Sequence, residues 1–428
     1  MLLFLYCIKN IDLLRAYKYR IYPADEQKVL MEKHFGCARL IFNTGLLHRK
    51  YAWQGGVSVG YFQSANELKA LKNDFPFLKE VNSQSLQSAL KNLDIAFLGM
   101  FKNRTGYPKF KSRVGKQSFS CPQNVSVEGK TLWLPKFTEG IPIELHRPFK
   151  GTIKTVTISR TPTNKYFASI LVDTGIAVPD KKSVTEASAI GIDVGLKSFA
   201  TIGNIDLTHA FKIDNPKYSR QEAELLARRK RQLSKKVKGS NNREKARLTL
   251  ARKYEKIEKQ NKDFLHKLSY RLTHDNQVDV ICIEDLNVKG MMANHKLARA
   301  IGEVSWSEFF RQLKYKSDWN GKTVLEAGRF SATSKDCHVC GCKNNSLTLS
   351  NREWDCPICG THHDRDENSV PNIISSAFLK YNKNRDGLPE STLGESLPLS
   401  LPKTRKRKAR TENQEKFRDN SLLSLVPS

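Results

Sequence analysis

The sequence contains no run of about 18 consecutive apolar residues, the length that a membrane-spanning helix requires. Its first residues, MLLFLYCIKNIDLL, are apolar, but they lack the positively charged start and the small-residue cleavage site of a secretory signal peptide. We therefore expect no membrane span and no secretory leader. Residues 1–14 are interpreted as an extension that precedes the first domain.

Acidic residues are scarce relative to basic ones, with 43 Asp and Glu against 72 Lys and Arg among 428 residues. The resulting net charge of +29 would make the chain repel itself unless a polyanion is its partner. Nucleic acid is the first candidate for this partner, and an anionic membrane surface is the second.

Cysteines are few, and their spacing does not suggest a disulfide framework. Four of the nine form two Cys-x-x-Cys pairs. Such pairs indicate metal binding in a reducing compartment, so we expect a cytoplasmic protein.

Residues 15–178 are predicted to form an N-terminal β-module for nucleic-acid recognition, with a helical insertion at about 24–105. A strand closed by Pro23 precedes a long helix from Ala24 to near Trp53. Segment 106–175 alternates apolar and polar residues, as antiparallel strands do. A further helix carries an apolar stripe that we expect to pack in the core: Leu86, Leu90, Leu93, Phe97 and Phe101.

Residues 186–380 alternate predicted strands and helices, which favours an α/β core with mixed strand pairing. Within it, residues 219–262 hold 16 Lys and Arg against 5 Asp and Glu, a net charge of +11. Gly239 to Asn242 should break this stretch into a helical hairpin. Its excess of unpaired positive charge predicts contact with a nucleic-acid backbone.

The segment CHVCGCKNNSLTLSNREWDCPICGTHHDRDEN places a cysteine framework directly before a cluster of His and Asp. The spacing of Cys337, Cys340, Cys356 and Cys359 is that of a zinc ribbon. Gly341 and Gly360 follow the two pairs where the turns need positive φ. Four thiolates complete a tetrahedron, so we expect structural zinc within 333–362 and no ligand role for Cys342.

His362 and His363 could add to this site, but with four cysteines present they are expected to pack or to touch nucleic acid. Arg365 could contact phosphate or form a surface ion pair. The acid cluster therefore needs a separate explanation.

Two acids, Asp193 and Glu284, interrupt or end apolar strands, and Asp366 begins the last core helix. Burying unpaired charge is costly, so a shared cation would explain three such acids, although single acids at strand ends are common. Hard oxygen ligands of this kind suit Mg²⁺ or Mn²⁺.

The segments GIDVGLKSFATIG, ICIEDLNVKGMM, the four cysteines and HDRDEN, in this order, resemble the TnpB family. The likeness extends over nearly the whole chain, through segments such as AYKYRIYPADEQ, KQSFSCPQN and REWDCPICGTHHDRD. Members of this family are encoded by insertion sequences and are related to the CRISPR type V effector nucleases.

The resemblance implies a transposon-encoded, RNA-guided DNA endonuclease with an RNase H-like (RuvC-type) core. It assigns catalysis and Mg²⁺ binding to Asp193, Glu284 and Asp366, and the partners would be a guide RNA and target DNA. After Asn368 the chain departs from the usual small residues and reads Ser369, Val370 and Pro371. We expect Pro371 in or near the first turn of the last helix, where its missing N–H is tolerated.

Two alternatives remain open: a guided DNA-binding regulator without cleavage, and a transposase that joins strands. Residues 381–428, including KTRKRKAR, are expected to be a disordered basic tail.

Overall fold

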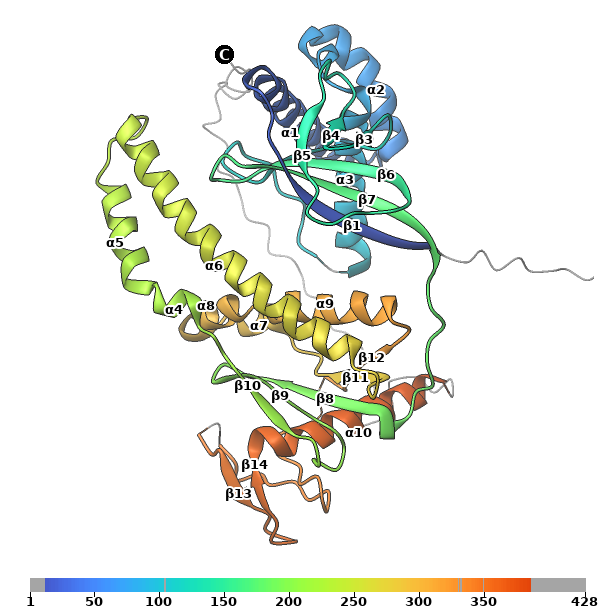
Figure 1. The fold of residues 1–428 in the computed structure, drawn as a ribbon, viewed down its shortest axis with the longest axis vertical. Helices are drawn as coiled ribbons and strands as arrows, with labels where there is room; N and C mark the ends of the chain where they lie inside the picture. The colour runs from blue at the N-terminus through green and yellow to red at the C-terminus, as the bar shows by residue number, and fades with distance from the viewer. Residues whose placement is uncertain (1–11, 104, 330, 332, 349, 386–428) are drawn as a thin grey trace, which may run out of the picture. The chain divides into compact units, whose positions relative to one another are not determined.

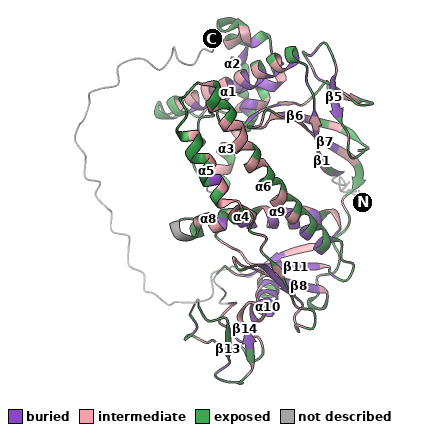
Figure 2. Ribbon diagram, turned by 60° about the vertical axis from the view of Figure 1, so that its left-hand side comes forward, coloured by how far each residue is buried: buried purple, intermediate pink, exposed green. Residues whose placement is uncertain are grey.

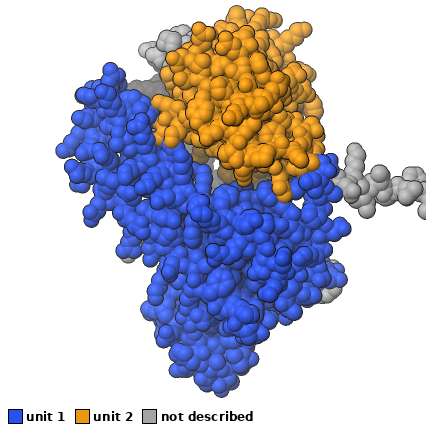
Figure 3. All heavy atoms as spheres, viewed as in Figure 1, with its two compact units in different colours: residues 1–13, 175–392 blue, residues 14–174, 393–428 orange. Residues whose placement is uncertain are grey.

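The computed structural model describes residues 12–385, except for residues 104, 330, 332 and 349. Two compact units divide them, residues 14–174 and residues 175–385 (Figure 3). Most of the expected extension 1–14 and of the expected tail 381–428, including KTRKRKAR, lies outside the described residues. Of the helices within the described part, none has both the length and the apolar character needed to cross a bilayer.

The first unit combines a seven-stranded sheet, in the order β2-β6-β7-β1-β5-β4-β3, with three α-helices and a short 3-10 helix (Figure 1). The pairs β2–β6, β6–β7 and β1–β5 are antiparallel, which confirms the antiparallel strands expected in 106–175. Helix α1 begins one residue after the predicted Ala24. The bounds are β1 Asp12–Ile21, α1 Asp25–Gln54, α2 Tyr61–Asp74, η1 Pro76–Lys79, α3 Ser83–Asn103, β2 Gln117–Cys121, β3 Ser126–Glu128, β4 Thr131–Trp133, β5 Ile141–Glu144, β6 Thr152–Arg160 and β7 Tyr166–Ala177.

The core of this unit lies between the sheet and helices α1 and α3. Strand β7 alternates with period two, so that Ala168, Ile170 and Val172 are buried on one face. In the predicted stripe of α3, Leu86, Leu90 and Leu93 are buried as expected. Phe101 is 69% exposed, so its prediction as a core residue is wrong. The helical period continues, but the buried face of α3 does not reach this last turn.

The second unit contains the acids and the cysteines. Its elements are η2 Glu186–Ser188, β8 Ala189–Val194, β9 Ser198–Gly203, β10 Phe211–Asp214, α4 Tyr218–Gln221, α5 Ala223–Ser234, α6 Asn241–His274, β11 Val280–Ile283, α7 Val288–Met291, α8 His295–Val304, α9 Trp306–Trp319, β12 Thr323–Glu326, β13 Glu353–Asp355, β14 His362–Asp364 and α10 Arg365–Arg385. The order of strands and helices confirms the expected α/β character.

The main sheet of this unit has the order β10-β9-β8-β11-β12. Strand β8 pairs antiparallel with β9 and parallel with β11, and β11 pairs parallel with β12, so the pairing is mixed as predicted. Helix α10 covers one face of the sheet, while α6 and α9 cover the other (Figure 1). The central strands β8 and β11 are therefore largely buried (Figure 2).

Helices α5 and α6 form the predicted hairpin, with the break at Gly239 and Ser240. Gly239 has φ of 85°, a conformation that glycine adopts without strain. Ser240 is the N-cap of α6, and its hydroxyl accepts a hydrogen bond from the Arg243 backbone N–H. Only the C-terminal part of α6, with Leu265, Leu268 and Leu272, is buried against the sheet.

A neutral histidine is built into the core of the first unit. The His34 side chain is 1% exposed, and its Nε2 accepts a hydrogen bond from the Asn82 backbone N–H at 3.1 Å. The Nδ1 atom then carries the proton that it donates to the Leu30 carbonyl oxygen, 2.8 Å away. Burial, reinforced by the positive charge of Lys136, holds the pKa of His34 below its ordinary value of 6.5.

We predict that this unit loses stability on acidification. Because the pKa of His34 is lower in the folded than in the unfolded chain, the unfolded chain binds more protons as the pH falls below 6.5. The free energy of unfolding should therefore be highest above pH 6.5 and should fall as the pH is lowered below this value. Hydrogen exchange of β2 and α1 peptides, measured from pH 7.5 to 5, should reveal the loss. His34→Gln should flatten this dependence, whereas the same change at the exposed His146 should not; equal slopes in both variants would contradict the assignment.

Candidate functional site

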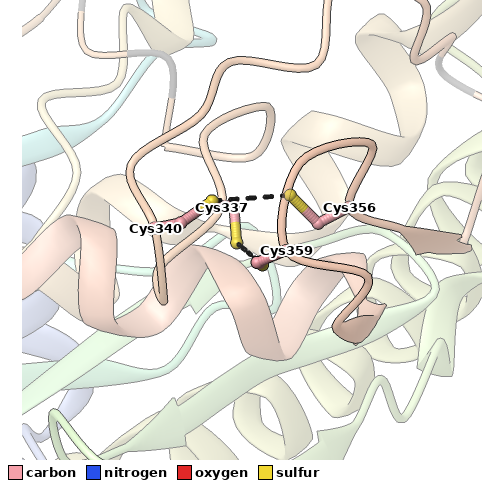
Figure 4. Close-up of side chains that lie close together, drawn as sticks. All are labelled: Cys337, Cys340, Cys356 and Cys359. Carbon is pink, nitrogen blue, oxygen red and sulfur yellow. Dashed lines mark hydrogen bonds between the residues drawn. The ribbon is translucent and has the colours of Figure 1, made fainter.

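The four paired cysteines lie together in the second unit (Figure 4). The ligand atoms of Cys337, Cys340, Cys356 and Cys359 all lie within 4.8 Å of one another. The sulfur atoms of Cys337 and Cys359 are 3.7 Å apart, and those of Cys340 and Cys356 are 3.5 Å apart. Four thiols at these separations fit a tetrahedral zinc site, as their spacing predicted. Cys342 lies outside this group, also as expected.

Each cysteine pair is held in a tight turn that ends at a glycine. The Gly341 N–H donates to the Cys337 carbonyl oxygen, and the Gly360 N–H donates to that of Cys356. Both glycines have positive φ, 72° and 68°, as predicted, and both lie where a side chain would strain the turn. These turns aim both thiols of a pair at one point.

Of the two adjacent histidines His362 and His363, only the second packs within this ribbon. His363 is buried beside Trp354, with ring centroids 4.7 Å apart, and its Nε2 is 3.1 Å from the Cys337 sulfur. His362 is exposed and pairs with Asp355 at 2.7 Å. The expectation that His363 packs is thus confirmed.

Asp193 and Glu284 stand side by side on neighbouring parallel strands. Strands β8 and β11 pair Ile192 with Ile283, so each acid is the next residue along its strand. Neighbouring strands are about 4.8 Å apart, and residues in register point to the same face. Ala189, Val280 and Cys282 face α10, so the alternation sends both carboxylates to the α10 side.

Asp366 reaches the same place from the first turn of α10. The negative charge of Asp366 contributes to the raised pKa of Asp193, and the Ser369 hydroxyl of the same helix lies 2.7 Å from Asp193 Oδ2. Asp364 has a different role: its Oδ1 accepts hydrogen bonds from the Asp366 and Glu367 backbone N–H groups and caps the helix. Its other oxygen pairs with Lys212 at 2.6 Å.

Burial and mutual repulsion dominate the electrostatics of the strand acids. Burial, followed by the negative charge of Glu284, raises the pKa of Asp193, while the Ser369 hydroxyl lowers it. Burial also raises the pKa of Glu284, against the hydrogen bond from the Thr333 hydroxyl, 2.8 Å from Oε1. Two adjacent, partly buried carboxyl groups with raised pKa values favour a compensating cation.

The three acids are more widely spaced than the cysteines. Among the described residues, the cysteine cluster is the one group of three or more ligands that all lie within 4.8 Å of one another. The oxygen donors, their burial and their repulsion fit Mg²⁺ or Mn²⁺.

The cysteine ribbon contacts two of the acids directly, through side chains that no sequence pattern predicts. Thr333, at its start, donates to Glu284, and Arg352 Nη1 lies 3.5 Å from Asp366 Oδ1. Arg352 also lines a cavity of about 380 Å³ together with Lys197, Lys217 and Arg220. Neither Thr333 nor Arg352 is part of a recognisable sequence motif. Their contacts with the acids could therefore be found only from the folded structure.

Hydrogen bonds also fasten the ribbon to α10. The buried Asn368 accepts from the His338 backbone N–H at 3.0 Å and donates to the Asp336 carbonyl oxygen at 2.8 Å. Arg365 donates to the Thr348 carbonyl oxygen and the Ser334 hydroxyl. Arg365 therefore holds the ribbon, and within the described ranges no ion pair of Arg365 is found.

The position expected for Pro371 is wrong. Because Asp364 caps the helix and α10 begins at Arg365, Pro371 falls in the second turn and is buried. Its missing N–H leaves the Glu367 carbonyl oxygen without its usual helical donor. Asp366 keeps its place at the start of the helix, as predicted.

Comparisons with known proteins agree with this arrangement. The family model described as "Probable transposase" matches residues 169–295, and "Cas12f1-like, TNB domain" matches residues 306–373. A "Helix-turn-helix domain" model matches residues 13–56, which here form strand β1 and the single helix α1.

Two curated relatives extend over most of the chain. A Streptomyces pristinaespiralis protein named "Putative RNA-guided DNA endonuclease" is 39% identical over 372 residues, 85% of this chain and 89% of its own. An Escherichia coli K12 protein with the same description is 30% identical over 386 residues, 85% of this chain and 92% of its own. Among solved structures, the Cas12f1-sgRNA-target DNA complex matches with a TM-score of 0.52 and 15% identity, over 85% of this chain and 99% of that one, which shows a shared fold.

The cysteine cluster yields a direct prediction. The purified chain should hold about one zinc ion, and Cys356→Ser should lose most of it because three thiolates close the tetrahedron poorly. Cys342→Ser removes a nearby thiol outside the cluster and should retain the zinc. Elemental analysis of the purified variants decides the matter: zinc loss from Cys342→Ser, or full retention by Cys356→Ser, would rule out this ligand set.

Proposed function

The chain belongs to the TnpB family, and from this premise we propose that it is an RNA-guided DNA endonuclease that hydrolyses phosphodiester bonds at Asp193, Glu284 and Asp366. The names of its relatives support this activity, and the family model described as a transposase supports a role linked to DNA transposition. The proposed fold of residues 186–380 is an RNase H-like (RuvC-type) core interrupted by the basic hairpin and a zinc ribbon.

The observation that supports this proposal most strongly is the position of Asp193 and Glu284, which are partly buried and adjacent at the ends of two paired parallel strands. The negative charges of Glu284 and Asp366 both raise the pKa of Asp193. A structural acid would normally have a cationic or multiple hydrogen-bond partner when buried. Here burial and the second carboxylate raise the pKa of Asp193 instead. Such an arrangement costs stability and is expected where it serves a cation-dependent reaction.

The chain's own residues would divide the chemistry among them. Asp193, Glu284 and Asp366 would hold Mg²⁺ or Mn²⁺, which when bound supplies an activated water and stabilises the leaving oxygen. Thr333 and Ser369 would fix the orientations of Glu284 and Asp193. Arg352 would orient the Asp366 carboxylate through their ion pair and would face a phosphate from the lining of the neighbouring cavity. The zinc held by the four cysteines would be structural, because four thiolates leave no open position.

The remaining surfaces suit a guide RNA and target DNA. The cavity beside the acids is lined by Lys197, Lys217 and Arg220 together with Tyr218, a combination that suits a single nucleic-acid strand. The N-terminal module, residues 15–178, would recognise nucleic acid, including a short DNA motif beside the target. Guided effectors grip the heteroduplex through its backbone.

Charge on the hairpin is segregated along α6. Near the sheet, Lys259, Lys262 and Lys267 pair with acids one turn earlier on the helix. Toward the hairpin tip, Lys245, Arg252 and Lys256 share one exposed helix face, and no ion pair of theirs is found within the described residues. Arg247, also near the tip, pairs with Glu244. Lys245, Arg252 and Lys256 therefore keep their positive charge available for phosphates, whereas the three lysines near the sheet are neutralised by their partners.

The nuclease activity is tested with the chain and its co-purified RNA on plasmid DNA. The wild type should make guide-dependent double-strand breaks that require Mg²⁺, and Asp193→Ala should reduce the rate at least about a thousandfold, as loss of a central catalytic group does. Guide-dependent binding without cuts would favour a DNA-binding regulator, and joined products a strand-joining transposase. Either result, or cleavage by Asp193→Ala at the wild-type rate, would refute the proposal.

The charge segregation is tested by comparing two triple variants with equal loss of charge. Replacing Lys245, Arg252 and Lys256 by Gln should weaken RNA binding and reduce the slope of log affinity against log salt by roughly two to three units, because each phosphate contact adds almost one. The matched variant changes Lys259, Lys262 and Lys267 to Gln, and its slope should change far less. If the slope of log affinity against log salt were equal in the two variants, the position of the charges along the hairpin would not matter for RNA binding, and the proposal would be wrong.

A further inference from the structure

Ser369 is a buried hydroxyl between two residues of the proposed active site. Its residue is 1% exposed, in the second turn of α10. The oxygen lies 2.7 Å from Asp193 Oδ2 and 2.8 Å from the Asp366 carbonyl oxygen. Both contacts are made by one side chain, and the second is to the backbone of the same helix.

A close approach of helix to sheet brings this hydroxyl to Asp193. Gly191 lies two residues before Asp193, on the same face of β8. A Cβ on Gly191 would come within 2.6 Å of the Val370 carbonyl oxygen, so only glycine lets α10 lie at this depth. Val370 is the neighbour of Ser369, and this packing therefore sets the distance between the hydroxyl and the carboxylate.

The hydroxyl has one hydrogen to share between two acceptors. An ionised carboxylate is the stronger acceptor, because hydrogen bonds to charged groups are shorter and about twice as strong as neutral ones. Asp193 Oδ2 should then take the hydrogen whenever Asp193 is charged. This contact fixes the rotation of the carboxylate, and it leaves Oδ1 and the second lone pair of Oδ2 free for other ligands.

We propose that Ser369 is a positioning residue that orients the Asp193 carboxylate for divalent-cation binding. This inference rests on the proposed function, since it assumes that the three acids hold the cation. Hydrogen-bond partners of a metal ligand typically change metal affinity or activity by about 10- to 100-fold when they are removed. Ser369 acts here through Asp193, and no contact of its own with substrate is required.

The test uses the full chain with its bound RNA and three variants. Ser369→Ala removes the hydroxyl, and Ser369→Cys keeps most of the volume with a much weaker donor. Ser376→Ala is the matched control, because Ser376 is a hydroxyl of the same helix that bonds the Gly328 N–H and Ser331, away from the acids. Calorimetric titration with Mg²⁺ gives the affinity, and cleavage against Mg²⁺ concentration gives a second measure.

Ser369→Ala and Ser369→Cys should each weaken Mg²⁺ binding by about 10-fold, and cleavage should largely recover at saturating Mg²⁺. Ser376→Ala should bind Mg²⁺ like the wild type. Unchanged affinity in both Ser369 variants, or an equal loss in Ser376→Ala, would overturn the inference. If Ser369→Ala unfolds, the Cys variant decides.

The two proposals can fail separately. A wild-type chain that binds Mg²⁺ through Asp193 but does not cut DNA refutes the nuclease function, while the calorimetric comparison still decides the role of Ser369. A wild-type chain whose Mg²⁺ affinity is unaffected by Asp193→Ala overturns the role of Ser369, whatever its activity.

Discussion

Two partly buried carboxyl groups that lie side by side are the constraint on which the second unit depends. The parallel register of β8 and β11 puts Asp193 beside Glu284 at the ends of two apolar strands, facing α10. Apolar packing alone would not tolerate this pair, because burial and repulsion disfavour the ionised forms. The hydroxyls of Ser369 and Thr333 offset part of that cost, and a divalent cation would offset the rest. The close approach of α10 at Gly191 and the position of the ribbon both serve this arrangement.

The ribbon matters to the acids in two ways. Its Thr333 hydroxyl donates a hydrogen bond to Glu284, and its Arg352 forms an ion pair with Asp366. Asn368 and Arg365, in the first turn of α10, form hydrogen bonds with the ribbon. Most of these contacts come from irregular segments, which have little regular structure to keep them in place. The cysteine cluster fixes those segments by closing two tight turns on one point. The cysteine cluster would thus support the proposed site of the three acids, which would explain why the two motifs are neighbours in the sequence.

Sequence patterns correctly predicted the features that depend on interactions between residues close together in the chain. The cysteine spacing, the glycines after each pair, the hairpin break at Gly239 and the mixed sheet all follow from turn chemistry or periodicity, and the structure has them. Family resemblance, not periodicity, singled out Asp366 over Asp364. Contacts made across the fold were missed: Arg352 and Thr333 reach the acids only because the ribbon folds back on α10. The exposed Phe101 and the second-turn Pro371 were misjudged because periodicity does not reveal where a core ends or which residue caps a helix.

The central claim is that Asp193, Glu284 and Asp366 share divalent cations. Anomalous diffraction from crystals of the chain soaked in Mn²⁺ tests it most directly, since the metal is located without reference to activity. We expect anomalous peaks within about 2.0–2.3 Å of carboxylate oxygens from all three residues, the range for hard divalent ions. Manganese bound only at exposed surface acids, with these three carboxylates free of it, would contradict the account.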